Sequence, residues 1–194
     1  VNAPGVSLTG DGTDIGPAEE VAEVIKAAGG EAVANTNSVA TPEGGQAIID
    51  AAMEHFGRID ILIHNAGIVR RSTLAEMSYA DFNDVLDVHL VGGFNVVRAA
   101  LPHMSEAGYG RIVLTSSCSG LYGNALVGNY ATAKTGLIGL SNVAAIEGAE
   151  HGVKCNLLLP GAVTRMAEGL DTSASPPMDP ELVAPAVGWL AHES

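Results

Sequence analysis

The sequence has little positive charge and few aromatic residues. Nine Lys and Arg residues stand against 22 Asp and Glu residues, which gives a formal net charge of −13. A surface with this balance repels polyphosphate backbones, and an aromatic content of 4% leaves few rings on which bases could stack. The composition therefore argues against nucleic acid as a partner.

Long apolar runs, a basic leader and clustered metal ligands are also missing from the printed sequence. No apolar run approaches the roughly 20 residues of a membrane span, so we expect no membrane partner. Val1 to Gly10 shows no basic segment followed by an apolar one, so we expect no signal peptide. The only cysteines, Cys118 and Cys155, are expected to be reduced thiols in a cytoplasmic protein. The six histidines are scattered, so we expect no metal site.

Apolar residues are plentiful, at 47% of the 194 residues, which is enough for the core of one domain. β-Branched runs alternate with helical patterns along the whole chain. Strands are expected at Ala32–Thr36, Ile59–His64, Arg111–Thr115 and Val153–Leu159. Helices are expected from Pro42 to Phe56, from Ser78 onward, over Tyr130–Glu147 and over Pro180–Ala191. This alternation predicts an α/β fold over 1–194, a doubly wound parallel sheet with helices on both faces and strands buried on both faces. Loops are expected at Asn2–Pro17 and Gly169–Asp179.

Tyr130 and Lys134 lie one helical turn apart in the third of these helices. A free tyrosine has a pKa of about 10, and a nearby cation lowers it, which would suit the phenol to proton transfer near neutral pH. Ser117, at the end of a strand, could donate a hydrogen bond to a substrate carbonyl oxygen. Taken alone, a Tyr/Lys pair at this spacing is usually a surface contact.

Four features together resemble the short-chain dehydrogenase/reductase family. They are Asn65-Ala66-Gly67 after one strand, Thr115-Ser116-Ser117 after the next, the Tyr130/Lys134 pair, and Pro160-Gly161 after the following strand. The resemblance implies a Rossmann-like fold and NAD or NADP as cofactor. It implies Tyr130 as catalytic acid/base, Ser117 as the residue that orients substrate, and Lys134 as a ribose ligand that depresses the pKa of Tyr130.

The same resemblance suggests further cofactor contacts. The backbone of Asn65, Ala66 and Gly67 would pack along the cofactor, and Pro160 and Gly161 would contact the nicotinamide. Asn37 would take an adenine-contacting position. Ala3 stands where NAD-preferring relatives have an Asp, so the choice between NAD and NADP stays open.

His89 points to one subgroup of the family. Most members have Asn at this position, where it supports a water-linked proton path to the Lys. The dehydrogenase part of peroxisomal multifunctional enzymes, which acts on D-3-hydroxyacyl-CoA, has His, as do its bacterial relatives. The segments Val88-His89-Leu90, Ser119 to Asn124 and Trp189 to Ser194 also resemble that subgroup. His89 is therefore a candidate catalytic residue, although a lone histidine in a helix is more often a packing residue.

The glycine-rich phosphate turn of the family has one candidate here, Thr9 to Gly16, in which Asp14 replaces the middle glycine. A carboxylate there opposes a pyrophosphate. We therefore favour another alignment, in which Val1-Asn2 ends the second strand and Ala3 to Gly16 is a loop. In that alignment the printed sequence lacks the family's first strand and helix, and also the last edge strand after Ser194.

These features predict an oxidoreductase that interconverts a secondary alcohol and a ketone, with an acyl thioester, D-3-hydroxyacyl-CoA, as the small-molecule substrate. The alternatives are a 3-oxoacyl carrier-protein reductase and a non-catalytic relative that binds no cofactor. Arg70, Arg71 and Arg165 could bind CoA phosphates, or could be ordinary solvated charges. The helices over Phe82–Leu101 and Tyr130–Glu147 imply a homodimer or homotetramer, unless their apolar residues only serve the core.

Overall fold

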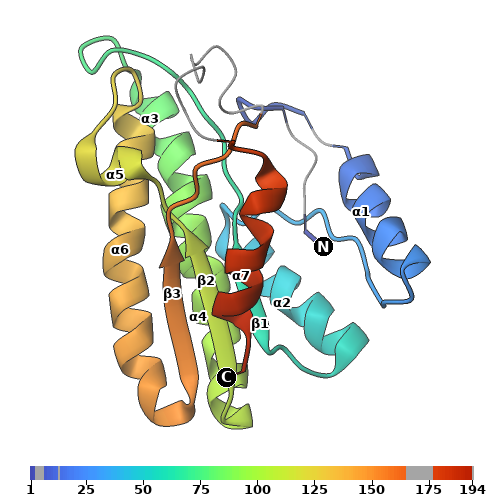
Figure 1. Ribbon diagram of the computed structural model, residues 1–194. Helices are drawn as coiled ribbons and strands as arrows, with labels where there is room; N and C mark the ends of the chain where they lie inside the picture. The colour runs from blue at the N-terminus through green and yellow to red at the C-terminus, as the bar shows by residue number, and fades with distance from the viewer. Residues whose placement is uncertain (3–6, 13, 165–176, 194) are drawn as a thin grey trace.

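The fold is built around a parallel sheet, as predicted. The computed structural model describes residues 1–2, 7–12, 14–164 and 177–193. The sheet runs in the order β1 (Ile61–His64), β2 (Gly110–Thr115) and β3 (Val153–Leu158), and both neighbouring pairs are parallel. Figure 1 shows the three strands at the centre of the molecule. Strand β2 therefore pairs on both sides.

The described residues form seven α-helices around this sheet. They are α1 (Gly16–Ala27), α2 (Pro42–Phe56), α3 (Tyr79–Leu86), α4 (Gly92–Ala107), α5 (Cys118–Tyr122), α6 (Gly128–Gly148) and α7 (Ala184–Ala191). A π turn, η1 (Asp87–Val91), joins α3 to α4 without a break. The helix expected over Pro180–Ala191 is divided into a 3-10 turn, η4 (Pro180–Leu182), and α7. A second 3-10 turn, η2 (Ala149–His151), follows α6.

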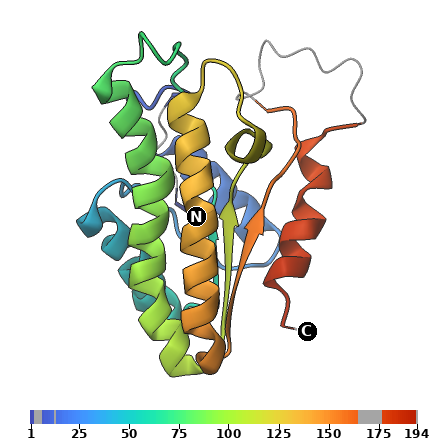
Figure 2. The same ribbon diagram turned by 90° about the vertical axis from the view of Figure 1, so that its left-hand side faces the viewer.

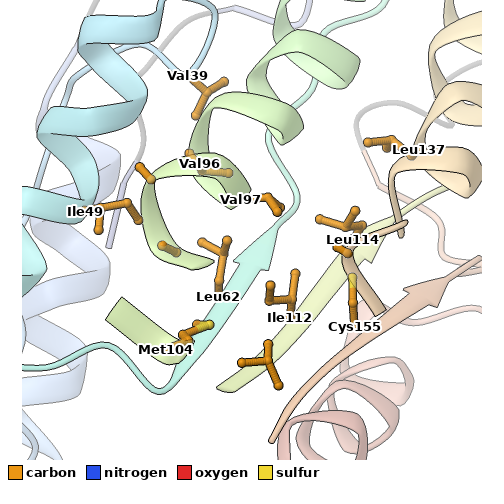
Figure 3. Packing of buried hydrophobic residues seen from close by; sticks show 14 residues of the cluster. Val39, Ile49, Leu62, Val96, Val97, Met104, Ile112, Leu114, Leu137 and Cys155 are labelled. Carbon is orange, nitrogen blue, oxygen red and sulfur yellow. The ribbon is translucent and has the colours of Figure 1, made fainter. Parts of the chain in front are cut away.

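Helices cover both faces of the sheet. Figure 2 shows α4 and α6 on one face and α7 on the other, and α2 packs against α4. The core lies between β1, β2 and the helices α2, α4 and α6 (Figure 3), where Ile49, Met104, Ile112, Leu114 and Leu137 are at most 1% exposed. Side chains of this size each contribute about 1.5–3 kcal/mol when fully buried.

Local capping explains where α2 begins and ends, as the sequence predicted. The Thr41 hydroxyl accepts a hydrogen bond of 3.0 Å from the Gly44 amide, and Pro42 occupies the first turn. Gly57 ends the helix with φ +71°, a left-handed conformation that favours glycine. Ser78 caps α3 in the same way, by accepting from the Asp81 amide at 3.0 Å.

Two expectations about strands were wrong. Strand β1 is not covered on both faces: its side chains alternate between buried and exposed, and Ile61 and Ile63 are 46% and 48% exposed. The segment expected as a strand at 32–36 forms only an isolated parallel bridge, between Asn35 and Asn2. The Asn35 amide donates to the Val1 carbonyl at 2.9 Å, which supports the alignment that ends a strand at Val1-Asn2.

The continuous helical segment from Tyr79 to Ala107 is long and apolar enough to cross a membrane by length and composition, but 50% of its apolar window is buried inside the protein. It contacts α2, α6 and the sheet, as a core helix of a globular fold does. Of the predicted loops, 3–6, 13 and 169–176 lie outside the described residues.

Candidate active site

The carboxyl ends of the three strands bring together the segments that the sequence analysis singled out. In the parallel register, His64 pairs with Leu114, and Leu114 pairs with Leu157, so the three strands end side by side. Asn65-Ala66-Gly67, Ser116-Ser117 and Pro160-Gly161 follow directly. The Ser116 amide donates to the Leu158 carbonyl at 2.7 Å and extends this edge. A doubly wound sheet binds its ligands at this edge.

Helix α6 presents Tyr130 and Lys134 to the same edge. Its first turn is held by Asn129, which is fully buried: the amide oxygen accepts from the Tyr130 backbone N–H at 2.8 Å. The Asn129 amide nitrogen donates to the carbonyls of Arg70 and Asp81, both at 3.1 Å. Asn129 therefore fixes the backbone from which the Tyr130 side chain extends. Sequence reasoning missed it, and its only signal was a polar residue directly before the tyrosine.

Lys134 is buried beside the tyrosine ring. Its ammonium group donates to the Thr115 carbonyl at 2.5 Å and lies 5.5 Å from the centre of the Tyr130 ring. Burial lowers the pKa of Lys134 to about 8, because the charged form loses hydration. The Ser116 hydroxyl donates to the Lys134 carbonyl at 2.8 Å and ties the helix to the end of β2.

The phenol of Tyr130 differs from the expectation. Its pKa is raised above the ordinary value, because burial penalises the phenolate; a hydrogen bond with the Ser117 side chain acts in the opposite direction. The net direction of this pKa shift is therefore opposite to the expected depression, although the Lys134 ammonium group lies 5.5 Å from the centre of the ring. Near neutral pH the phenol is therefore protonated and is a proton donor.

Ser117 caps the short helix α5 and faces the tyrosine. Its hydroxyl oxygen accepts a hydrogen bond of 3.1 Å from the Ser119 amide, and its side chain is hydrogen-bonded with Tyr130. One oxygen atom placed between these two hydroxyl groups could therefore bind both. That arrangement suits the oxygen of an alcohol or a ketone.

His89 is buried behind Tyr130, at 1% exposure, in the π turn η1. The two rings meet edge to face, with centroids 5.1 Å apart and an interplanar angle of 87°. The Nε2 atom of His89 lies 3.1 Å from the Ile68 amide and 2.9 Å from the Ile68 carbonyl. Burial is the larger cause and the Lys134 charge the smaller one that lower the pKa of His89 to about 3. The ring is therefore neutral and contacts the Tyr130 ring, but no proton path through it is present in the described contacts.

The predicted cofactor contacts fit a dinucleotide at this edge. Asn65 and Gly161 are exposed, and Ala66, Gly67 and Pro160 are partly exposed, so their backbone is accessible. The Lys134 ammonium group supplies donors of the kind that ribose hydroxyls accept. Gly67 has a second role: a Cβ there would lie 2.3 Å from Cε1 of His89, so glycine is needed for the ring to pack. Asn37 is exposed in the segment before α2. Its side-chain amide nitrogen donates a hydrogen bond of 3.2 Å to the side-chain oxygen of Asn35.

The segment Thr9 to Gly16 does not form a phosphate turn in the described residues. The Asp14 carboxylate accepts from the Gly16 amide at 2.9 Å, directly at the beginning of α1. The donor that a phosphate would use is therefore already bound to a carboxylate, which supports the alignment that treats this segment as a loop.

Arg70 is unsuited to binding a CoA phosphate, because two carboxylates already neutralise it. Its guanidinium lies 2.9 Å from Asp81 and 2.6 Å from Asp84. Its Nε donates to the Thr9 carbonyl at 3.0 Å, which ties the N-terminal loop to this region. Arg71 is exposed, and Arg165 lies outside the described residues.

Comparisons with known proteins agree with this geometry. The family model for short chain dehydrogenases matches residues 9–174. The chain is 48% identical over 195 residues to Peroxisomal multifunctional enzyme type 2 of Drosophila melanogaster, covering 100% of this chain and 32% of that protein. It is 44% identical to the Peroxisomal hydratase-dehydrogenase-epimerase of Saccharomyces cerevisiae, covering 100% of this chain and 21% of that protein. The crystal structure of a short chain dehydrogenase from Mycobacterium avium superposes with a TM-score of 0.85 at 41% identity, covering 100% of this chain and 68% of that one.

The chain therefore belongs to the short-chain dehydrogenase family, whose members are oxidoreductases that use NAD or NADP. The chain spans about a third or less of the length of these two curated relatives.

Proposed function

We propose that this chain carries the catalytic part of an NAD(P)-dependent oxidoreductase that interconverts a D-3-hydroxyacyl-CoA and its 3-oxoacyl-CoA. One observation carries the reaction type: the half-buried Tyr130 is hydrogen-bonded with Ser117 and stands one turn before the buried Lys134 at the carboxyl edge of a parallel sheet. The substrate class rests on the relatives, whose names describe peroxisomal multifunctional and hydratase-dehydrogenase enzymes.

In the direction of ketone reduction, the Tyr130 hydroxyl donates its proton to the substrate oxygen while Ser117 holds that oxygen by a hydrogen bond. In alcohol oxidation, the tyrosine must first lose its proton to solvent, and the phenolate oxygen then takes the hydroxyl proton. Bound NAD(P) supplies the hydride chemistry. Lys134 would bind the ribose through its ammonium donors and would place positive charge beside the tyrosine ring. Because burial raises the pKa of Tyr130, we expect reduction to proceed at neutral pH and oxidation to accelerate as the pH rises.

The direct test is Tyr130→Phe in the full-length protein. Loss of the acid/base should lower kcat by about 10²–10⁴-fold and leave the affinity for NADH unchanged. Tyr122→Phe is the matched control, because Tyr122 is 85% exposed and lies nearby in α5. Near-normal turnover by Tyr130→Phe would refute the assignment.

Substrate and nucleotide are tested in one matrix of assays. The proposal predicts the highest kcat/KM with 3-oxoacyl-CoA or D-3-hydroxyacyl-CoA, compared with carrier-protein thioesters, with NAD(H) and NADP(H) measured in parallel. A clear preference for the carrier protein would instead support the reductase alternative.

The phosphate turn motivates the non-catalytic alternative, because Thr9 to Gly16 does not form one in the described residues. Titration with NADH, followed by nucleotide fluorescence, distinguishes the two. Saturable binding supports the oxidoreductase, and its absence supports a subunit that binds no cofactor.

The thiols Cys118 and Cys155 are both free, and a cytoplasmic location stays a prediction.

We also propose self-association through α4 and α6. An apolar groove between these helices is lined by Phe94, Val97, Leu101, Leu140, Val143 and Ala144. Phe94 and Val143 are 49% and 51% exposed, an unfavourable situation in water. Arg98 and Glu147 border the same groove, so a second copy related by a two-fold axis could pair opposite charges. Phe94→Glu should reduce the mass measured by light scattering to that of a monomer.

A further inference from the structure

His64 is a buried polar side chain at the end of an apolar strand, and the reaction proposed above does not use it. It is the last residue of β1 and is 3% exposed. The ring packs against the beginning of α4, where a Cβ on Gly93 would lie 3.2 Å from its Cδ2. Its Nε2 lies 2.9 Å from the His89 carbonyl oxygen. A carbonyl only accepts, so Nε2 carries the proton and donates it.

The accepting carbonyl belongs to the π turn η1. In this turn the Gly92 amide reaches back five residues, to the Asp87 carbonyl. Such turns widen a helix and occur preferentially at functional sites. A carbonyl in the turn can accept a donor from outside the helix, and His64 supplies one to His89. The end of β1 is thereby hydrogen-bonded to η1.

The position of the His89 backbone determines where its ring lies. The ring is confined between the Gly67 backbone, the Ile68 peptide and the Tyr130 ring. The His89 ring meets the tyrosine edge to face at 5.1 Å. A shift of the His89 carbonyl would therefore move the ring that supports Tyr130.

We propose that His64 is a positioning residue for the reaction: its Nε2–H holds the His89 carbonyl, and so places the His89 ring that fixes the Tyr130 phenol beside Ser117. This inference rests on the proposed function. The neutral state of His64 is consistent with the geometry, since burial, opposed in part by the bond with His89, lowers its pKa to about 4. The groups that act on this pKa are the backbone carbonyl of His89 in η1, which raises it, and the charge of Lys134 in α6, which lowers it.

The experiment compares His64→Leu, which removes the donor, with His64→Gln, whose amide can place an N–H near the same point. His64→Leu should lower kcat by about 10- to 100-fold, the size of effect that misplacement of a catalytic group produces, with the KM for NAD(H) unchanged. His64→Gln should recover most of the rate. His55→Leu is the matched control, because the His55 ring also contacts a backbone carbonyl, that of Ala51 at 2.8 Å, but on an exposed part of α2.

A second readout needs no substrate. In protein labelled with ¹³C-tyrosine, the Tyr130 resonance is assigned with Tyr130→Phe. It should shift in His64→Leu and keep its wild-type position in His64→Gln and His55→Leu. If His64→Leu does not fold, His64→Asn replaces it, because the shorter amide cannot reach the carbonyl.

If the role of His64 is purely structural, His64→Leu should have a lower thermal midpoint of unfolding. Its kcat, measured well below that midpoint, and its Tyr130 resonance should then be unchanged. That result would overturn the proposal. A wild-type protein without oxidoreductase activity would refute the proposed function instead, and the resonance would still report whether His64 positions the tyrosine.

Discussion

Two buried histidines should make this protein lose stability in mild acid. Burial lowers the pKa of His64 to about 4 and the pKa of His89 to about 3, whereas both are near 6.5 in an unfolded chain. Because the folded-state pKa is the lower one, the unfolded chain binds protons first as the pH falls. The stabilisation is present in full above about pH 6.5 and decreases as the pH falls towards the folded values.

The size of the loss follows from these values. Between about pH 7.5 and about pH 5, each histidine should contribute a loss of about 2 kcal/mol, since the unfolded form is almost fully protonated at the lower pH and the folded form is not. Together this is about 4 kcal/mol, a large part of the roughly 5–15 kcal/mol that stabilises a typical domain. The Lys134 charge nearby adds to the resistance of both rings to protonation.

The assay is guanidinium unfolding, followed by circular dichroism, at both pH values. The wild type should show the full loss, whereas His64→Gln and His89→Asn, which cannot titrate there, should each lose about 2 kcal/mol less. His55→Gln, on the exposed face of α2, should keep the wild-type dependence. If wild type and His64→Gln lose the same free energy between the two pH values, the reasoning from burial is wrong.

Three further predictions concern single positions. Gly67→Ala would place a Cβ 2.3 Å from the His89 ring, and should lower kcat while the fold, checked by circular dichroism, is retained. Arg111→Met should lower the free energy of unfolding by about 1–3 kcal/mol or more, because the buried guanidinium donates to four carbonyls, those of Gly110, Gly152, His192 and Glu193. Thr41→Ala should cost about 1 kcal/mol in urea unfolding through loss of the α2 cap, with no change in kcat.

The sequence was most informative where the signal is local. Thr41 and Gly57 delimit α2 as expected, because a capping hydroxyl and a left-handed glycine act within one turn. The meeting of the three strand ends at one edge was also predictable, because parallel strands must place the segments that follow them on the same side. Helices α1 and α5 were not predicted: α1 begins after Ile15, which makes no side-chain cap, and α5 has only five residues, too few for a periodic pattern.

The details of the site depended on burial, which spacing does not reveal. The Tyr130/Lys134 spacing suggested a lowered tyrosine pKa, yet burial, opposed in part by the hydrogen bond with Ser117, raises that pKa. The contacts of His64 and Asn129 depend on residues 25 to 59 positions away, so no local pattern could have indicated them. The exposed face of β1 is likewise a property of the assembled sheet.

The π turn limits which deletions this chain can tolerate. One extra residue in a helix rotates everything after it by about 100°. With the π turn in place, α3 packs on α6 while α4 packs on α2 and the sheet. Deleting one residue from Asp87–Val91 would give a regular helix, but it would turn either α3 or α4 away from its partners. Single deletions should therefore be poorly tolerated here, although substitution of Val91, the exposed residue of the same turn, should be harmless.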